Sequence, residues 1–412
     1  EGGVDDDDDD DVREHYDVCI AGAGLSGAVI AERYASQLGK SVAVIEKRDH
    51  IGGNCYDYVD DETGIRVSRY GAHLFHTVND RVWEYVHEFS AWTKYEHEVV
   101  GIVNGKHVPI PVNIETVNLL FGQNITTTEE MDGWLEREQV KYDRPPENSE
   151  EMALSRVGKR LYELIFRPYT IKQWNKEPRE LGPEVTARIP VRNNRDMRYF
   201  GDPHQALPTD GYTAIFENLL CHPNIEVRLS TDYFDVKDRL TCGRTYFTGP
   251  IDAYFAAAGY EKLEYRSLDF ERRVVKDVGA TGTFQPKFVV NHPSLEDDFT
   301  RIVEYKHLLN QTSDHTVIFV ERSKDGGEPY YPVPNLENKA LYRRYQELAA
   351  REENVTFVGR LANYKYFNMD QAILNALELF DEDGGLGERS VGRIASCVSS
   401  ATAADERRRR RR

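Results

Sequence analysis

Residues 16–47, YDVCIAGAGLSGAVIAERYASQLGKSVAVIEK, decide the fold of this chain. Their first part, 16–22, is an apolar, β-leaning run that predicts a buried strand. The glycine-rich GAGLSG follows at 22–27, and the alanines and leucines after it predict a helix that ends at Gly39. Residues 41–47 predict a second buried strand. This order of strand, turn, helix and strand predicts an α/β, Rossmann-like domain.

The glycines of the turn suit the binding of a pyrophosphate. Gly22 makes the turn tight, Gly24 lets a phosphate approach the backbone, and Gly27 lets the helix pack closely on the strand. The start of the helix then offers free N–H groups and a partial positive charge. Glu46 ends the second strand, where a carboxylate can accept hydrogen bonds from ribose hydroxyls. These residues predict a dinucleotide site, and a purely structural turn is the alternative.

A second glycine pair, Gly52-Gly53, follows Glu46 and precedes Asn54. Such a pair lets another backbone segment come close, at a point where NAD enzymes usually continue into a helix. The pattern resembles the extended fingerprint of FAD enzymes related to amine oxidases and glutathione reductase. We therefore predict FAD as the cofactor, with Gly53 and Asn54 beside it, and a simple surface turn as the alternative.

Length and composition limit the class of protein. The 412 residues exceed the ~250–300 at which single cores stop growing, so we expect more than one lobe. The net charge of −18 disfavours nucleic-acid binding, and no apolar run reaches the ~18 residues of a membrane span. Five cysteines without a CxxC pair argue against a disulfide framework or structural zinc, and they favour a reducing cytoplasm. The charged ends, 1–15 and 401–412, are expected to be disordered tails.

Downstream motifs carry histidine, arginine and tyrosine. His73 in YGAHLFHT (70–77) could lie over a flavin ring or be a satisfied core histidine, and we expect no metal there because no carboxylate or cysteine cluster accompanies it. The apolar spacing of 151–174 predicts a helix that stops before Pro168. Further on, arginines and tyrosines alternate in an otherwise acidic chain. Arginine pairs with phosphate in a bidentate manner and aromatic rings stack on bases, so this pattern indicates a nucleotide-like anion as ligand.

Many ordered motifs together resemble the UDP-galactopyranose mutase family, in its bacterial form. They include GAGLSGA, VIEKRDHIGGN, YGAHLFHT, YTIKQW, RIPVR, LPTDGYT, FTGPID, LEYRSL, FTRIVEYKH, EPYYPV and GRLANYKYFNMDQ, between about residues 16 and 375. The resemblance implies a discontinuous FAD-binding domain, an inserted helical bundle and a twisted antiparallel β-sheet. Its expected ranges are 16–80, 209–255 and 353–400 for the FAD-binding domain, 80–180 for the helices, and 93–112, 185–207 and 262–335 for the sheet. EVVGIVNGKHVPIP at 98–111 independently predicts a hairpin that turns at Asn104-Gly105.

The resemblance also implies an activity: the interconversion of UDP-galactopyranose and UDP-galactofuranose through a covalent adduct between N5 of the reduced flavin and the sugar. NAD(P)H or dithionite would supply the reduced form. A homodimer in the cytoplasm would be expected. Such an enzyme needs no catalytic triad, because the flavin is the nucleophile.

The family's site residues can be carried over by motif position. Tyr169 matches the tyrosine that stacks on uracil, and Trp174 the tryptophan near the sugar. The arginines and tyrosines that match diphosphate contacts are Arg188, Tyr199, Arg301, Tyr330 and Tyr366. Arg266 matches a further functional arginine, while His73 and Arg360 match flavin neighbours.

One position departs from the family pattern. Bacterial members read YYDM where this chain has Tyr366-Phe367-Asn368-Met369, so an amide replaces an acid beside the flavin and sugar. Asn368 can still donate and accept hydrogen bonds, so we expect activity to be retained. The alternatives are an FAD-dependent oxidase or desaturase of the amine-oxidase type, which would need a dry apolar pocket, and a nucleotide-binding module without catalysis.

Overall fold

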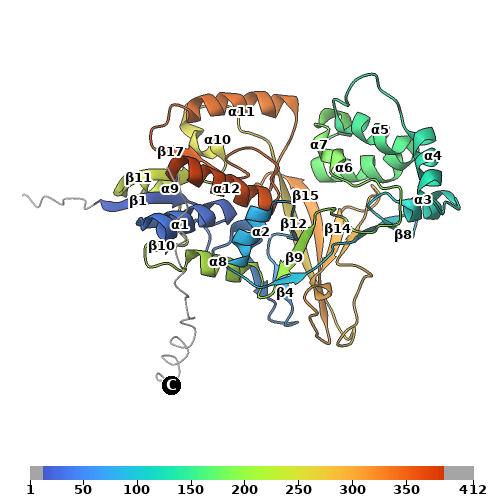
Figure 1. Ribbon diagram of the computed structural model, residues 1–412, viewed down its shortest axis with the longest axis horizontal. Helices are drawn as coiled ribbons and strands as arrows, with labels where there is room; N and C mark the ends of the chain where they lie inside the picture. Colours follow the sequence, from blue (N-terminus) through green and yellow to red (C-terminus); the bar gives the residue numbers. More distant parts are fainter. Residues whose placement is uncertain (1–12, 385–412) are drawn as a thin grey trace, which may run out of the picture.

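The structure, a computed structural model, describes residues 13–384. A parallel sheet with its covering helices lies at one end of the molecule and the helices α3–α7 lie at the other (Figure 1). A long sheet that contains β12, β14 and β15 runs between the two ends. Among the described residues, no helix is both long enough and apolar enough to cross a membrane.

The parallel sheet is the predicted Rossmann-like core. In the described part of the chain its strand order is β10–β2–β1–β11–β17. These strands are β10 (Ile225–Arg228), β2 (Val42–Ile45), β1 (Glu14–Ala21), β11 (Leu240–Phe247) and β17 (Val355–Phe357). Its strands come from three separate parts of the chain, so the domain is discontinuous, as expected. The strand β1 starts two residues earlier than predicted, and the acidic run before it lies outside the described residues, as do the predicted basic tail and the end of the predicted range 353–400.

Helices from distant parts of the sequence cover one face of this sheet. Val29, Ile30 and the fully buried Phe216 belong to the apolar core there. The helices are α1 (Leu25–Leu38), α2 (Asp80–His87), α8 (Tyr212–Leu220) and α12 (Met369–Gly384). Because α2 packs into this core, the helical domain begins later than the expected residue 80. The remaining helices of this end are α9 (Tyr233–Val236), α10 (Ile251–Tyr254) and α11 (Leu336–Ala349), with the short η1 (Gly53–Cys55), η4 (Lys237–Arg239) and η5 (Ala256–Ala258).

A disulfide joins Cys19 on β1 to Cys242 on the adjacent strand β11. The cysteine count and spacing argued against a disulfide framework, and this single pair was not predicted. Sequence spacing could not reveal it, because the two residues are 223 positions apart and meet only when the parallel strands align. Cys55 is a buried thiol, and burial raises its pKa to about 12.

The second sheet has, in the described residues, the order β16–β12–β15–β14–β13–β7–β8. Its strands are β16 (Tyr331–Pro332), β12 (Tyr265–Val275), β15 (Thr316–Asp325), β14 (Arg301–Glu304), β13 (Val289–Asn291), β7 (Val99–Val103) and β8 (Lys106–Pro109). The last two form the predicted hairpin, and Asn104 and Gly105 both have positive φ, as the favoured two-residue turn requires. The pairing is antiparallel except between β13 and β7, which are parallel.

Residues 185–207 contribute no strand to that sheet, although the resemblance implied that they would, and touch its edge only through isolated bridges of Arg198 to Glu98 and of Val191 to Val112. They contain the end of α7 (Glu184–Ala187), an extended segment and the start of β9 (His204–Pro208). The strand β9 instead pairs with β5 (Phe75–Thr77) and β6 (Trp92–Lys94) in a separate small sheet. A further hairpin consists of β3 (Asp57–Val59) and β4 (Arg66–Ser68), and η6 (Tyr305–His307) follows β14.

The helical domain continues through Pro168, contrary to prediction. The π-turn η2 (Tyr162–Phe166) follows α5 (Ser149–Leu161), and Pro168 then occupies the first turn of α6 (Arg167–Trp174). Proline is tolerated in a first turn, where its missing N–H would have no helical partner. Tyr169 and Trp174 therefore lie on a helix rather than in a loop. The other members of the domain are α3 (Ile114–Phe121), α4 (Thr128–Glu138) and η3 (Pro178–Glu180).

Replacing two glycines of this domain by alanine should change its stability in opposite directions. Gly158 interrupts α5 with φ +72°, and a Cβ there would lie 2.1 Å from the Glu138 carbonyl oxygen. Gly158→Ala should therefore destabilise the domain by roughly 1–3 kcal/mol. The matched control is Gly133 in α4, where a Cβ would meet only Arg137 Nη1 at 3.5 Å. Gly133→Ala should stabilise by roughly 0.5–1 kcal/mol. Urea unfolding of both variants measures this, and equal midpoints would contradict the local geometry.

Candidate active site

A cavity of about 330 Å³ opens at the carboxyl ends of β1 and β2. The predicted cofactor residues Gly22, Gly24, Glu46, Gly53 and Asn54 line it, together with His73, Arg360 and the aromatic side chains Tyr233, Phe234 and Phe247. Ligands of open parallel sheets bind at this edge. The cavity is therefore where the sequence predicted a dinucleotide.

The glycines of this cavity are held in contacts that exclude a side chain. A Cβ on Gly53 would lie 2.9 Å from the Cα of Gly24, and a Cβ on Gly27 would lie 2.0 Å from the Gly22 carbonyl oxygen. Gly27 itself does not line the cavity and acts in helix–strand packing, the role expected of the third glycine. The two glycine-rich segments, around Gly24 and Gly53, thus touch each other, which explains why the second pair follows Glu46 so closely.

Glu46 is buried and its carboxylate already organises the turn. One oxygen accepts from the backbone N–H of Ala23 at 2.8 Å, and the other from that of Arg48 at 2.9 Å. An ionised carboxylate has about four lone-pair sites, so it can still accept from ribose hydroxyls. The cavity's shape, glycine backbone and acid fit the adenosine and pyrophosphate parts of FAD.

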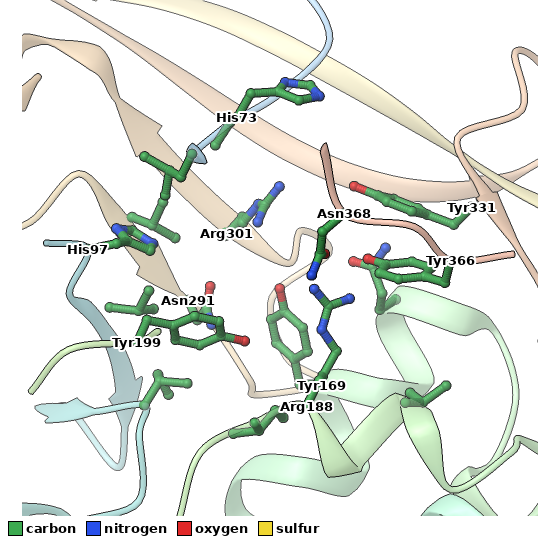
Figure 2. A pocket seen from close by; sticks show the side chains of 18 of the residues that line it. His73, His97, Tyr169, Arg188, Tyr199, Asn291, Arg301, Tyr331, Tyr366 and Asn368 are labelled. Atoms are coloured by element: carbon green, nitrogen blue, oxygen red, sulfur yellow. The ribbon is translucent and has the colours of Figure 1, made fainter. Parts of the chain in front are cut away.

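A second cavity, of about 240 Å³, adjoins the first. Side chains from the helical domain, the second sheet and the Rossmann-like domain converge on it, and Figure 2 labels ten of them. The sequence-predicted residues that line it are Asn54, His73, Tyr169, Trp174, Arg188, Tyr199, Arg301, Tyr330, Arg360, Tyr366 and Asn368. They come from segments up to about three hundred residues apart that meet only in the folded chain.

Three arginines give this cavity its charge. Arg301 donates from Nε to the buried Glu321 carboxylate at 2.6 Å. Burial lowers the pKa of Arg301, but Glu321 together with Tyr169 and Tyr331 outweighs burial and holds that pKa well above its usual value. Arg188 instead lies over the ring of Tyr366, 4.5 Å from its centroid, and Arg360 lies 5.6 Å from the same centroid. Within residues 13–384, no carboxylate forms an ion pair with Arg188 or Arg360, so the cavity carries uncompensated positive charge.

Aromatic rings form the walls around these cations. Tyr331 and Tyr366 stack with centroids 5.2 Å apart, and Trp174 packs at 6.0 Å from Tyr366. Burial raises the pKa of Tyr199 and Tyr169 above that of a free phenol, so both remain neutral hydroxyl groups near pH 7. Charged phosphates and a flat base would both find complementary surfaces here.

Two histidines are held neutral. His73 faces both cavities, its Nδ1 lies 2.9 Å from the Gly71 carbonyl oxygen, and burial lowers its pKa to about 4. The carbonyl fixes the proton on Nδ1 and leaves Nε2 as an acceptor. His97 is more deeply buried, and burial, helped by Arg301 and His76, lowers its pKa to about 3. Both imidazoles are therefore uncharged at neutral pH, and neither can act as a general acid there.

Apart from Gly27, Arg266 is the predicted site residue that lines neither cavity. It is 2% exposed and lies behind the end of α6, where Nε donates to the Gln173 carbonyl oxygen at 2.9 Å and Nη1 pairs with Asp325. Its place in the fold is a support for the helix that carries Trp174.

Sequence reasoning missed several residues of the second cavity. Asn291 and His97 line it, and Asn291 Oδ1 and His97 Nδ1 are buried without a hydrogen-bond partner in the described structure. Glu321 lies behind Arg301, and one of its oxygens is likewise unpaired. No local motif marked these residues. A lone acid in the apolar strand TVIFVE (316–321) was the available signal for Glu321.

The two cavities meet at five shared residues: Asn54, His73, Arg360, Asn368 and Met369. The side chain of Asn368 points into the second cavity, on the side where Arg188 lies (Figure 2). A ligand in the cationic cavity would thus contact one end of a ligand in the glycine-lined cavity. The arrangement can hold a dinucleotide cofactor against an anionic nucleotide.

Comparison with known proteins agrees with this arrangement. Residues 164–366 match the UDP-galactopyranose mutase family model, and residues 20–89 match an NAD(P)-binding Rossmann-like domain. A probable UDP-galactopyranose mutase of Klebsiella pneumoniae is 38% identical over 89% of this chain and 94% of its own. A dTDP-fucopyranose mutase of Escherichia coli is 37% identical over 88% of this chain and 96% of its own.

Solved structures share the fold. A reduced UDP-galactopyranose mutase superposes with a TM-score of 0.70 at 18% identity, covering 92% of this chain and 96% of that one. A putative protoporphyrinogen oxidase from Exiguobacterium reaches 0.64 at 14% identity, covering 90% and 98%. The oxidase likeness concerns the fold alone. From the sequence identity over nearly its whole length, the chain belongs to the UDP-galactopyranose mutase family, a family of flavoprotein isomerases.

Proposed function

We propose that this protein binds FAD in the glycine-lined cavity and interconverts UDP-galactopyranose and UDP-galactofuranose in the cationic one. The observation that carries the proposal is the junction of the two cavities at Asn54, His73, Arg360, Asn368 and Met369. An enzyme whose cofactor reacts directly with a sugar needs such contact. When bound, a reduced flavin supplies a nucleophilic ring nitrogen.

The arginines would act on the diphosphate. As the bond between the anomeric carbon and the diphosphate breaks, negative charge grows on the leaving group, and cations already in place stabilise it. Arg301 is fixed by Glu321, and Arg188 lies against Tyr366 without a carboxylate partner. Tyr169 and Trp174 on α6 would hold the base and the sugar side. Neutral His73 offers Nε2 as an acceptor where the two ligands meet.

Two further expectations belong to the proposal. A reducing compartment, such as the cytoplasm, suits a cofactor that must be kept reduced, and a homodimer is expected from the likeness to the family.

The relative that is named a dTDP-fucopyranose mutase supports a second candidate, a dTDP-linked 6-deoxy sugar as substrate. The two candidates differ in the methyl group of the base, the ribose 2′-hydroxyl and the sugar 6-hydroxyl.

Activity should depend on reduction of the cofactor without consuming reductant. FAD-loaded protein treated with dithionite should convert UDP-galactofuranose, whereas air-oxidised protein should be nearly inactive. Chromatography of the products measures this, with dTDP-fucofuranose as the competing substrate. Equal turnover of oxidised and reduced samples would contradict the proposal, and faster turnover of the dTDP sugar would select the second candidate.

Removal of either diphosphate arginine should slow the reaction strongly. Arg301→Ala and Arg188→Ala should each lose roughly 3 kcal/mol of transition-state stabilisation, about a hundredfold in rate. Arg301→Lys keeps a charge beside buried Glu321 and guards against misfolding. The control is Arg273→Ala, an exposed arginine that pairs with Glu271 on the same strand. If kcat/KM on UDP-galactofuranose fell only a few-fold, these arginines would have no role at the diphosphate.

Asn368 should order hydrogen bonds rather than transfer protons. Its backbone N–H donates to Gln371 and its side chain faces both cavities. Asn368→Asp should change kcat by less than about tenfold, since a proton-transfer group would be worth ~10²–10⁴-fold. Asn368→Ala should be worse, because the group of the flavin or sugar that the amide would bind loses a hydrogen bond worth roughly 1–3 kcal/mol. Steady-state kinetics under dithionite tests both, and a hundredfold gain in the Asp variant would make the position catalytic.

A further inference from the structure

Lys172, on the helix that carries Tyr169 and Trp174, does not line either cavity. Its ammonium group instead lies among four backbone carbonyl oxygens of one loop, residues 292–299, between β13 and β14. It donates to those of Ser294 and Phe299, each at 2.7 Å, to that of Asp297 at 3.3 Å, and to that of His292. An ammonium has three donors, so the carbonyls use its full capacity.

The loop has other contacts, but they do not reach the helix. His292 Nδ1 lies 3.2 Å from Asp297 Oδ2 within the loop, and Arg322 on β15 pairs with Asp298 at 3.0 Å. Of the hydrogen bonds among the described residues, those of Lys172 are the ones that join α6 to this loop. Burial lowers the pKa of Lys172 to about 8, although Asp297 and Asp298 counteract that shift.

The two segments that Lys172 joins each carry or flank residues that line the second cavity. Tyr169 and Trp174 come from α6, while Asn291 and Arg301 stand at the two ends of the loop's connection between strands. The α6 end has further supports, because the Gln173 carbonyl oxygen accepts from Arg266 and from Ser323 at 2.7 Å. Those contacts hold α6 to β12 and β15, not to the loop.

We infer that Lys172 is a positioning residue that acts by binding the carbonyl oxygens of the 292–299 loop. It fixes one wall of the second cavity, formed by Tyr169 and Trp174, relative to another, formed by Asn291 and Arg301. This role rests on the proposed function, since it matters for a ligand whose base contacts one wall and whose phosphates contact the other. Small displacements between such walls are costly, because a misplacement of about 1 Å can lower rates by roughly a hundredfold.

The test compares Lys172→Met with Lys159→Met in the FAD-loaded protein. Methionine keeps length and apolar volume but removes all three donors, and Lys159 is an exposed lysine of the same helical domain. In calorimetric titration with UDP, Lys172→Met should bind roughly 10–100-fold more weakly, and the control should bind like the unmodified protein. KM should rise more than kcat falls. FAD content and flavin absorbance should stay unchanged, which a general loss of structure would not allow.

Hydrogen exchange gives a second readout that does not need the ligand. Amides of residues 292–300 should exchange faster in Lys172→Met, and those of the Rossmann-like strands should not. Lys172→Arg keeps the charge and several donors, so it should recover part of the affinity. Unchanged UDP affinity in Lys172→Met, or loss of FAD together with UDP binding, would overturn the inference. Failure of the unmodified protein to bind UDP would instead contradict the proposed function.

Discussion

The close contact of two glycine-rich segments sets the geometry on which the rest of the site depends. Gly24 and Gly53 approach so closely that a Cβ on Gly53 would lie 2.9 Å from the Cα of Gly24, and a Cβ on Gly27 would lie only 2.0 Å from the Gly22 carbonyl oxygen. These contacts draw the end of β1, the start of α1 and η1 together. The cavity left beside them is lined by backbone rather than by side chains, which lets a pyrophosphate come near. The second cavity then forms where the other domains meet this edge.

The second cavity is positively charged, whereas the molecule as a whole is negatively charged. The chain as a whole carries −18, yet Arg188 and Arg360 face the cavity without carboxylate partners among the described residues. Arg301 pairs with the buried acid Glu321, which does not itself line the cavity. Cations kept unpaired in a cavity are costly unless a ligand neutralises them. The aromatic rings around Arg188 and Arg360 reduce that cost and also present flat surfaces to a base.

Local patterns predicted the Rossmann-like core and the β7–β8 hairpin because each depends on nearby residues: the glycine turn, the buried strands and Asn104-Gly105. The family resemblance supplied the site residues, and the fold brings nearly all of them to two adjoining cavities. What escaped prediction depends on contacts between distant segments. Cys19 meets Cys242 only across aligned strands, Glu321 has its partner 20 residues away and Lys172 has its partners 120 or more residues away, and Pro168 was misinterpreted because a π-turn precedes it.

The central claim is that a flavin and a nucleotide sugar lie in contact at the junction of the two cavities. Titration of UDP-galactose into FAD-loaded protein, followed by the flavin absorption spectrum, tests this most directly. The account predicts a saturable change in the flavin bands with the same dissociation constant that calorimetry gives, because the sugar enters the flavin's immediate surroundings at His73 and Asn368. Calorimetric binding with an unchanged flavin spectrum would place the nucleotide sugar elsewhere and contradict the claim.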